Sequence, residues 1–167
     1  MPHTVESSSS TKRWTFGHVL GVVATAIGII AGAVAIRDYL QKRPSYDLTG
    51  EWRLTNTIES TTYRPFKSLR LGYRLFVRQH GVEFDGNGEK WSENDVDIPS
   101  GQHSPITVNG TIDGPRVKAT FAERGARRET TGTFEWTLDT SARTMAGRFT
   151  STAADSSGSS RVERVTK

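Results

Sequence analysis

The chain carries two hydrophobic patterns, one after the other. Residues 16–36 form a continuous apolar run in which His18 is the only ionisable side chain. As an α-helix this run spans about 32 Å, which matches the roughly 30 Å hydrocarbon core of a bilayer. We therefore predict a transmembrane helix over residues 14–37, with a disordered polar tail at 1–13 and a juxtamembrane linker at 38–49.

Small residues recur at alternating steps of four and three along this helix, and so share one face. They are Gly17, Gly21, Ala24, Gly28, Ala31 and Ala35. In lipid, helices associate where small side chains let their backbones approach closely. The stripe predicts a homo-oligomer assembled through the helix, although many spans that stay single are also rich in Gly and Ala.

From Gly50 onward the pattern changes to a period of two, which is typical of strands with one buried face. Trp52, Leu54 and Ile58 alternate with polar residues, and the same alternation continues from Leu69 to Val77. Six further runs lie at 82–85, 106–112, 117–121, 134–138, 145–149 and 160–165. This succession predicts an all-β domain over residues 50–167, folded as an eight-stranded antiparallel up-and-down barrel, with a two-sheet sandwich as the alternative.

Three local features refine this prediction. Glycines inside the strands allow sharp curling or close backbone approach; they are Gly72, Gly86, Gly110, Gly132 and Gly147. A tight turn at His80-Gly81 would pair Val77 with Phe84 on the inner face. Residues 90–104 are polar and predict a long connection.

The basic charge gathers around the helix. The net charge of the chain is +4, and residues 1–46 hold five Lys and Arg against two Asp and Glu, which leaves +1 for the rest. This distribution favours the lipid bilayer as a partner over a nucleic-acid polymer. Positive residues directly after the helix, Arg37, Lys42 and Arg43, oppose translocation. They place the β domain on the cytosolic side of the inner membrane in a single-pass arrangement.

A cleaved signal peptide is the competing interpretation of the same segment. Ala33-Val34-Ala35 has the small-x-small form of a cleavage site. The apolar run is longer than the 7–15 residues usual for a signal peptide, which favours retention.

Strand order predicts where a ligand would bind. In an up-and-down barrel alternate connections lie at opposite ends, and the longer ones collect at the end away from Gly50. Candidate anion-binding residues on that rim are Arg64, Lys67, Arg124, Arg127, Arg128 and Arg161. Acidic residues nearly balance them, so a self-paired rim is the alternative. Candidate lumen residues are Trp52, Asn56, Tyr73 and Trp136, with a filled core as the alternative.

Catalysis has little support in the sequence. The four histidines are scattered and suggest no metal site, and no nucleophile elbow or phosphate loop is present. The chain has no cysteine, which excludes disulfides and thiolate ligands. We therefore predict a non-enzymatic protein with no catalytic residues, no cofactor and no bound metal.

The first strand carries a family resemblance. Gly50-Glu51-Trp52 resembles the G-x-W signature of lipocalins and related calycin barrels, although the other motifs of that family and its final helix are not matched. The resemblance implies that an arginine of the last strand, Arg161 or Arg164, packs across Trp52. It also implies a small ligand bound inside the barrel.

A second resemblance concerns the architecture. A helix before a small barrel is similar to the transmembrane β-barrel effectors of bacterial cyclic-oligonucleotide antiphage systems, which usually have two spans where this chain has one. Our first hypothesis is a membrane-anchored binding or sensing module for a small ligand, an anionic one among the candidates. The alternatives are a defence effector that senses a cyclic nucleotide and disrupts the membrane, and a cleaved, secreted carrier.

Overall fold

The computed structural model describes residues 46–126 and 128–166. The predicted tail, helix and small-residue stripe, and most of the linker, lie outside these residues. Within them, no helix has the length and apolar character needed to cross a membrane. The prediction of a transmembrane span at 14–37 therefore stays a prediction.

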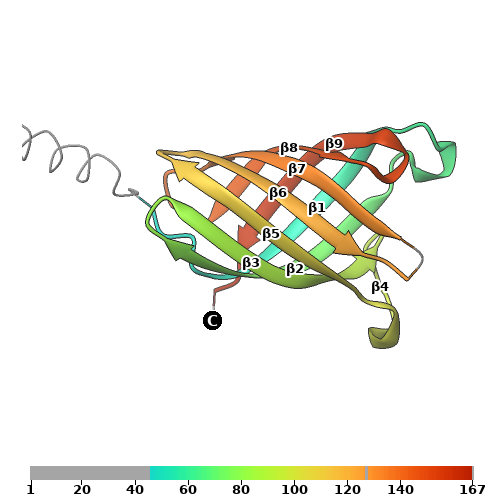
Figure 1. The fold of residues 1–167 in the computed structure, drawn as a ribbon, viewed down its shortest axis with the longest axis horizontal. Coiled ribbons are helices and arrows are strands. Elements are labelled where there is room, and N and C mark those ends of the chain that lie inside the picture. Colours follow the sequence, from blue (N-terminus) through green and yellow to red (C-terminus); the bar gives the residue numbers. More distant parts are fainter. Residues whose placement is uncertain (1–45, 127, 167) are drawn as a thin grey trace, which may run out of the picture. The chain divides into compact units, whose positions relative to one another are not determined.

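Eight long strands close into one antiparallel barrel (Figure 1). They are β1 (Gly50–Ser60), β2 (Arg70–His80), β3 (Glu83–Glu93), β5 (Ser104–Asp113), β6 (Arg116–Arg124), β7 (Glu129–Leu138), β8 (Thr144–Ser151) and β9 (Ser156–Arg164). Strands that follow one another pair side by side, and β1 pairs with β9 to close the ring. This confirms the up-and-down barrel and excludes the two-sheet sandwich.

Short elements decorate the connections. The two-residue β4 (Val96–Asp97) pairs with the end of β3. Three 3-10 turns, η1 (Arg64–Phe66), η2 (Ser100–Gln102) and η3 (Ala153–Asp155), lie between strands.

The alternation of the sequence builds the barrel interior. Trp52, Leu54 and Ile58 of β1 are buried, while Arg53 between them is exposed. Every long strand contributes inward apolar residues to one continuous core. Because the barrel is closed, no long strand presents an unpaired edge.

Glycine makes room for aromatic rings inside this narrow barrel. Phe84 lies directly opposite Gly110 in the β3–β5 ladder, and Phe121 lies opposite Gly132 in the β6–β7 ladder. A Cβ atom on Gly110 would lie 2.6 Å from the Phe84 ring, and one on Gly132 would lie 2.5 Å from the Phe121 ring. These glycines therefore permit the close approach that their place in the sequence predicts.

The predicted hairpin register is wrong by two residues. The turn consists of Gly81 and Val82, so His80 pairs with Glu83 and Val77 pairs with Gly86 rather than with Phe84. Gly81 has φ +64°, a conformation that glycine adopts without a steric penalty. Because side chains alternate with a period of two, a shift of two residues leaves each of them on its predicted face.

The predicted connection at 90–104 is also wrong in its first part, because β3 continues to Glu93. Its inward positions after Phe84 are Gly86, Gly88 and Lys90. None of them is hydrophobic, so the alternation that marks a strand is lost in the sequence although the ladder continues.

The two ends of the barrel differ, as the sequence predicts. Tight connections, at 81–82, 114–115 and 139–143, share the end where β1 begins, which we call the closed end. The connections at the opposite end, which we call the mouth end, are mostly longer and lie at 61–69, 94–103, 125–128 and 152–155. Figure 1 shows both ends of the barrel.

Trp52 organises the closed end. Its side chain is fully buried, and its Nε1 donates a hydrogen bond of 2.7 Å to the carbonyl oxygen of Leu48. The Arg164 guanidinium lies 4.5 Å from the centre of the indole and donates to the carbonyl oxygens of Thr49 and Asp47. Arg164, not Arg161, therefore occupies the place that the lipocalin resemblance implies.

Candidate ligand-binding cavity

A cavity of about 370 Å³ opens inside the barrel at the mouth end. The large apolar residues of its lining are Ile58, Phe66, Leu69, Leu71, Phe121 and Phe149. At the closed end, where Trp52 and Trp136 fill the interior, the remaining void is only about 10 Å³. The lumen is thus packed in one half and hollow in the other, so the filled-core alternative holds only for the closed half.

The cavity is hollow because its inward positions carry smaller side chains. Ser104 begins β5, Thr130 lies near the start of β7, and Ser156 begins β9. The corresponding positions in the closed half carry aromatic and large aliphatic residues. An eight-stranded barrel is just wide enough either to be filled by side chains or to hold one small ligand. The small inward residues of the mouth half leave the space for a ligand there.

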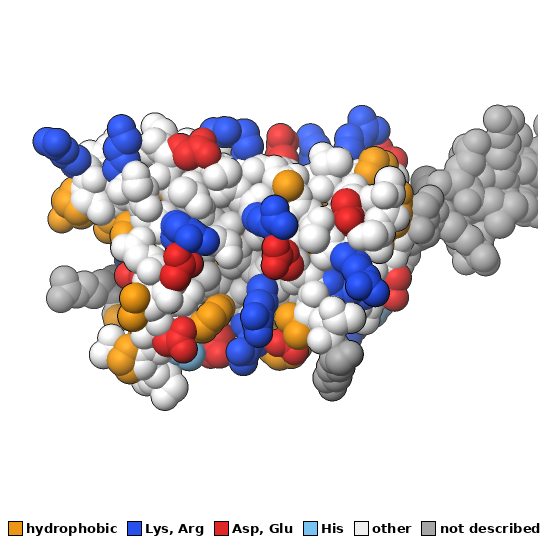
Figure 2. All heavy atoms as spheres, turned by 180° about the vertical axis from the view of Figure 1, so that it is seen from behind, with side chains coloured by type: hydrophobic (Ala, Val, Ile, Leu, Met, Phe, Trp, Pro, Cys, Tyr) orange, Lys and Arg blue, Asp and Glu red, His pale blue; other side chains and the backbone are white. Residues whose placement is uncertain are grey.

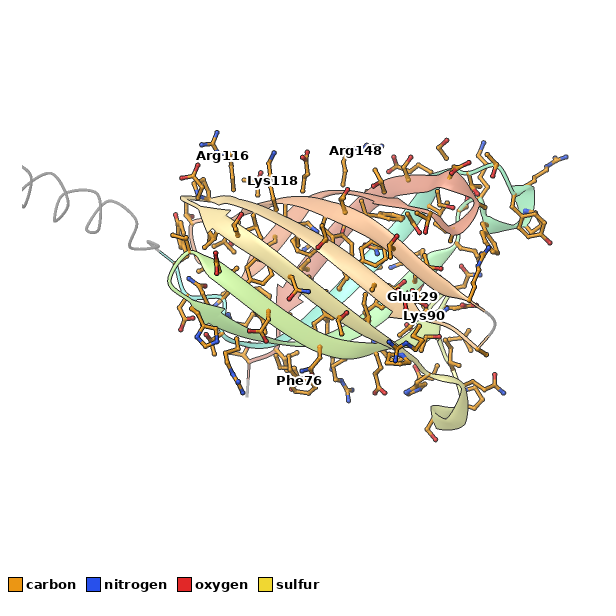
Figure 3. All side chains as sticks on the ribbon, viewed as in Figure 1. Phe76, Lys90, Arg116, Lys118, Glu129 and Arg148 are labelled. Carbon is orange, nitrogen blue, oxygen red and sulfur yellow. The ribbon has the colours of Figure 1, made fainter. Side chains whose placement is uncertain are left out.

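A chain of polar contacts forms one wall of the cavity. The Tyr73 hydroxyl donates a hydrogen bond of 2.9 Å to Glu123 Oε2. Lys90 Nζ lies 3.5 Å from Glu123 Oε1 and 2.8 Å from Glu93 Oε1. The Lys90 and Glu123 side chains are only 17% and 13% exposed, and Figure 3 shows Lys90 within the barrel near its mouth end.

The surroundings hold two of these groups in their protonated forms. Burial raises the pKa of Tyr73 well above its ordinary value, and the neighbouring Glu123 carboxylate raises it further. Burial acts to lower the pKa of Lys90, but its hydrogen bond to Glu93 and the charge of Glu123 outweigh this and raise the pKa overall. Tyr73 is therefore a hydrogen-bond donor and Lys90 a cation at neutral pH.

Asn56 lines the same cavity, half-way along β1. The residue is 2% exposed, and its Oδ1 has no hydrogen-bond partner among the described residues. Other buried hydroxyls of the barrel have hydrogen-bond partners. Ser160 accepts a hydrogen bond of 2.8 Å from Trp136 Nε1, and Ser156 donates one of 2.6 Å to the carbonyl oxygen of Ala153. Most buried polar groups have partners, so the Asn56 oxygen stands out.

The four predicted lumen residues fall into two pairs. Asn56 and Tyr73 line the cavity, as the prediction requires. Trp52 and Trp136 are packed in the closed half, where Trp136 stacks on Phe134 with ring centres 4.4 Å apart. A ligand in the cavity would therefore meet the first pair and not the second.

The predicted rim residues do not form one cluster. Arg128 lines the cavity, and Arg64, Lys67 and Arg124 are exposed at the mouth end. Arg161 lies instead on the outer face of β9, 2.7 Å from Glu163. Arg127 lies outside the described residues.

Sequence reasoning did not include Lys90 and Glu123 among the candidate lumen residues, although both line the cavity. A signal for Glu123 was present, because it continues the inward phase of Val117, Ala119 and Phe121 in β6. Lys90 continues the inward phase of β3, but there the preceding glycines hide it. A charged residue at an inward-facing position near the end of a strand is therefore a sequence signal for a cavity residue.

The outer surface carries charges in opposed pairs. Lys118 and Glu135 approach to 3.3 Å across β6 and β7, and Arg148 and Glu59 approach to 3.2 Å. Figure 2 shows acidic and basic side chains interspersed on one face, and in Figure 3 Lys118 and Arg148 point away from the barrel. A solvated surface accounts for this arrangement.

A larger hollow of about 640 Å³ lies on the outer face of β1, β2 and β9. Two of its three arginines are engaged by exposed carboxylates, Arg70 by Asp95 at 2.6 Å and Arg161 by Glu163 at 2.7 Å. The cavity in the barrel is the better candidate, because its lining contains Asn56 Oδ1. Among the described residues this is one of two buried side-chain atoms without a hydrogen-bond partner, and the other, Arg164 Nε, belongs to the packed closed end.

Histidine does not build a metal centre in residues 46–126 and 128–166, where no three His, Asp or Glu side chains converge on a common point. His103 instead contacts Glu89 at 3.1 Å and the carbonyl oxygen of Ile98 at 2.9 Å.

Comparison of the chain with protein-family models, with curated proteins and with solved structures finds no match. The likeness to lipocalins rests on the eight-stranded barrel and on the packing of Arg164 over Trp52.

Proposed function

We propose that this protein binds or senses a small molecule in the barrel cavity and is not an enzyme. The observation that carries the proposal is the cavity of about 370 Å³, whose lining includes a buried carboxamide oxygen without a partner among the described residues. Small-molecule sites are concave, largely apolar and supplied with a few polar groups. A cavity of this size has the volume of about a dozen water molecules.

The polar wall supports binding rather than catalysis. Glu123 contacts both Tyr73 and Lys90, and these two groups are held in their protonated forms. A general acid or base needs a pKa near the working pH, whereas the pKa values of Tyr73 and Lys90 are both shifted away from neutrality. The array orients a ligand more readily than it transfers a proton.

The backbone at the mouth end supports a functional opening. Non-glycine residues with positive φ gather there: Ser68, Asn94, Asp95, Ala154 and Asp155. Such conformations cost free energy and tend to occur at functional sites. The Ala154 carbonyl oxygen accepts hydrogen bonds from the backbone N–H of Thr62 at 2.8 Å and from Thr61 Oγ1 at 3.1 Å. These bonds tie two mouth connections together.

Membrane attachment belongs to the same proposal and rests on residues 14–37 of the sequence. We propose a single-pass anchor in the inner membrane, a β domain in the cytosol and a homo-oligomer formed through the helix. The second candidate function, a defence effector that senses a cyclic nucleotide, is favoured by the exposed Arg64, Lys67 and Arg124 beside the cavity. These cations could contact phosphates outside the cavity.

The test is ligand binding by the full-length protein in a mild detergent. Calorimetry and thermal unfolding are run with indole, with laurate and with a 3′,3′-cyclic dinucleotide. A ligand at one hundred times its Kd stabilises the folded state by about 2.7 kcal/mol, so binding raises Tm.

Two variants of β5 localise the binding. Ser104→Phe places a ring in the cavity and should abolish binding, whereas Thr107→Phe places the same ring on the outer face and should leave it unchanged. The absence of binding by every probe, or equal binding by both variants, would contradict the proposal. Binding of the dinucleotide alone would favour the defence effector.

A further inference from the structure

We infer that the ligand is recognised by an N–H or O–H group that donates to the Asn56 carboxamide, and that its enclosed part is uncharged. This inference rests on the proposed function and narrows the chemical class of the ligand.

The position of Asn56 is unusual for a residue that only packs. It lies in the inward row of β1 between Leu54 and Ile58, which are both buried and apolar. A leucine at this position would complete the core without burying a polar group. An asparagine there is disfavoured in the folded state unless its carboxamide finds partners.

The barrel itself does not supply the missing donor. The Tyr73 hydroxyl is directed to Glu123, and Trp136 Nε1 is directed to Ser160. The Asn56 oxygen is left without a partner among the described residues. The terminal torsion of asparagine is broad, so rotation of the carboxamide can present this oxygen to a molecule in the cavity.

The charges of the lining cancel, which determines what can enter. Lys90 and Arg128 are opposed by Glu93 and Glu123, and Lys90 already contacts both carboxylates. An ion buried against this wall would lose its water and meet only groups that are already paired, Lys90 with Glu93 and Glu123, and that is unfavourable. The other cation of the lining, Arg128, is exposed to solvent. An uncharged, largely apolar body fits the six large apolar lining residues, while any charged group of the ligand would remain at the exposed arginines outside.

The experiment compares two bicyclic probes of nearly equal size and shape. Indole carries an N–H donor, and benzofuran has an oxygen acceptor in its place. Calorimetry on the full-length protein, with detergent blanks, should show indole binding about ten-fold more tightly than benzofuran, because a buried acceptor discriminates against a ligand without a donor.

Two leucine variants assign the preference to a residue. Asn56→Leu should bind both probes equally, whereas Asn87→Leu makes the same change on the outer face of β3 and should keep the ten-fold preference. A preference that survives in Asn56→Leu overturns the inference. If Asn56→Leu does not fold, the ratio of the two affinities in the unmodified protein decides.

The outcomes separate this inference from the function on which it rests. If both probes bind equally to the unmodified protein and Ser104→Phe abolishes both, the cavity binds ligands but the donor is not selected, and the inference is wrong. If neither probe nor any ligand of the earlier panel binds, both the proposed function and the inference fail.

Discussion

The ion pair between Lys90 and Glu123 tests whether the cavity wall is shielded from water. We consider Lys90→Met and Glu123→Gln, alone and together. Methionine keeps most of the lysine stem, and glutamine keeps an acceptor for Tyr73. The matched control is Lys118→Met with Glu135→Gln on the outer face, where the same residue types approach to 3.3 Å but both side chains are 70% exposed.

The structure sets the expected size of the coupling. Two unit charges 4 Å apart attract by about 1 kcal/mol in water and by about 4 kcal/mol at an effective dielectric constant of 20. Desolvation cancels part of the larger value, and Lys90 retains Glu93 as a partner at 2.8 Å. We therefore expect a coupling energy of about 1–2 kcal/mol inside the barrel and below about 0.5 kcal/mol on the surface.

The assay is urea unfolding of the full-length protein in mild detergent, followed by tryptophan fluorescence at low and at high salt. High salt should remove the surface coupling and leave most of the inner coupling, because buried pairs are screened less. An inner coupling no larger than the surface one would refute the reasoning, since Lys90 and Glu123 would then be as well solvated as Lys118 and Glu135.

Three further predictions concern the frame of the barrel. Gly132→Ala should lower the free energy of unfolding by about 2–3 kcal/mol, because its Cβ would lie 2.0 Å from the Thr150 carbonyl oxygen; urea unfolding measures this. Arg164→Met should cost about 1–3 kcal/mol, because it removes the cation over Trp52 and two hydrogen bonds to carbonyl oxygens. Asp139→Asn should lower Tm at pH 7 but not near pH 2: a hydrogen bond from Ser141, with others from nearby backbone N–H groups, lowers the pKa of Asp139 to about 2. Because that pKa lies below the ordinary 3.8, the stabilisation is present above pH 3.8 and is lost as the pH falls toward 2.

Two of these changes have a matched control variant, and the third is checked by its pH dependence. Gly101→Ala adds a Cβ with no atom within 4 Å and should change stability by less than about 0.5 kcal/mol. Arg161→Met removes an exposed arginine of the same strand as Arg164 and should be nearly neutral. For Asp139, a difference in Tm that persists unchanged down to pH 2 would show that its charge does not stabilise the turn.

The barrel was predictable because most of its strands have a local sequence signal, the alternation of hydrophobic and polar residues. Alternation from Trp52 to Ile58 and from Leu69 to Val77 needs no knowledge of the rest of the chain, and strand order then decides which connections share an end. The hairpin register was not predictable, because it depends on whether His80 or Gly81 takes the first turn position. The extension of β3 was hidden by glycines that contribute no hydrophobic signal.

The candidate site was only half predictable for a similar reason. Asn56 and Tyr73 are polar residues in inward phases, and the phase alone places them in the lumen. The contact between Lys90 and Glu123 joins β3 to β6 across the intervening β5, and no periodicity within one strand indicates it. How far each tryptophan lies along the barrel axis, which separates Trp52 from the cavity, also follows from the assembled ring and not from the strand pattern.

Leu48, Trp52 and Arg164 pack together at the closed end of the barrel. Residues in the opposite half can therefore be substituted without loss of this packing. Residues that stabilise the barrel and residues that would select a ligand lie at different positions along the barrel axis. Substitutions in one set therefore need not disturb the other. A deep mutational scan should therefore divide the barrel into an intolerant base and a permissive upper tier. The same division makes the scaffold a natural starting point for redesigned small-molecule receptors.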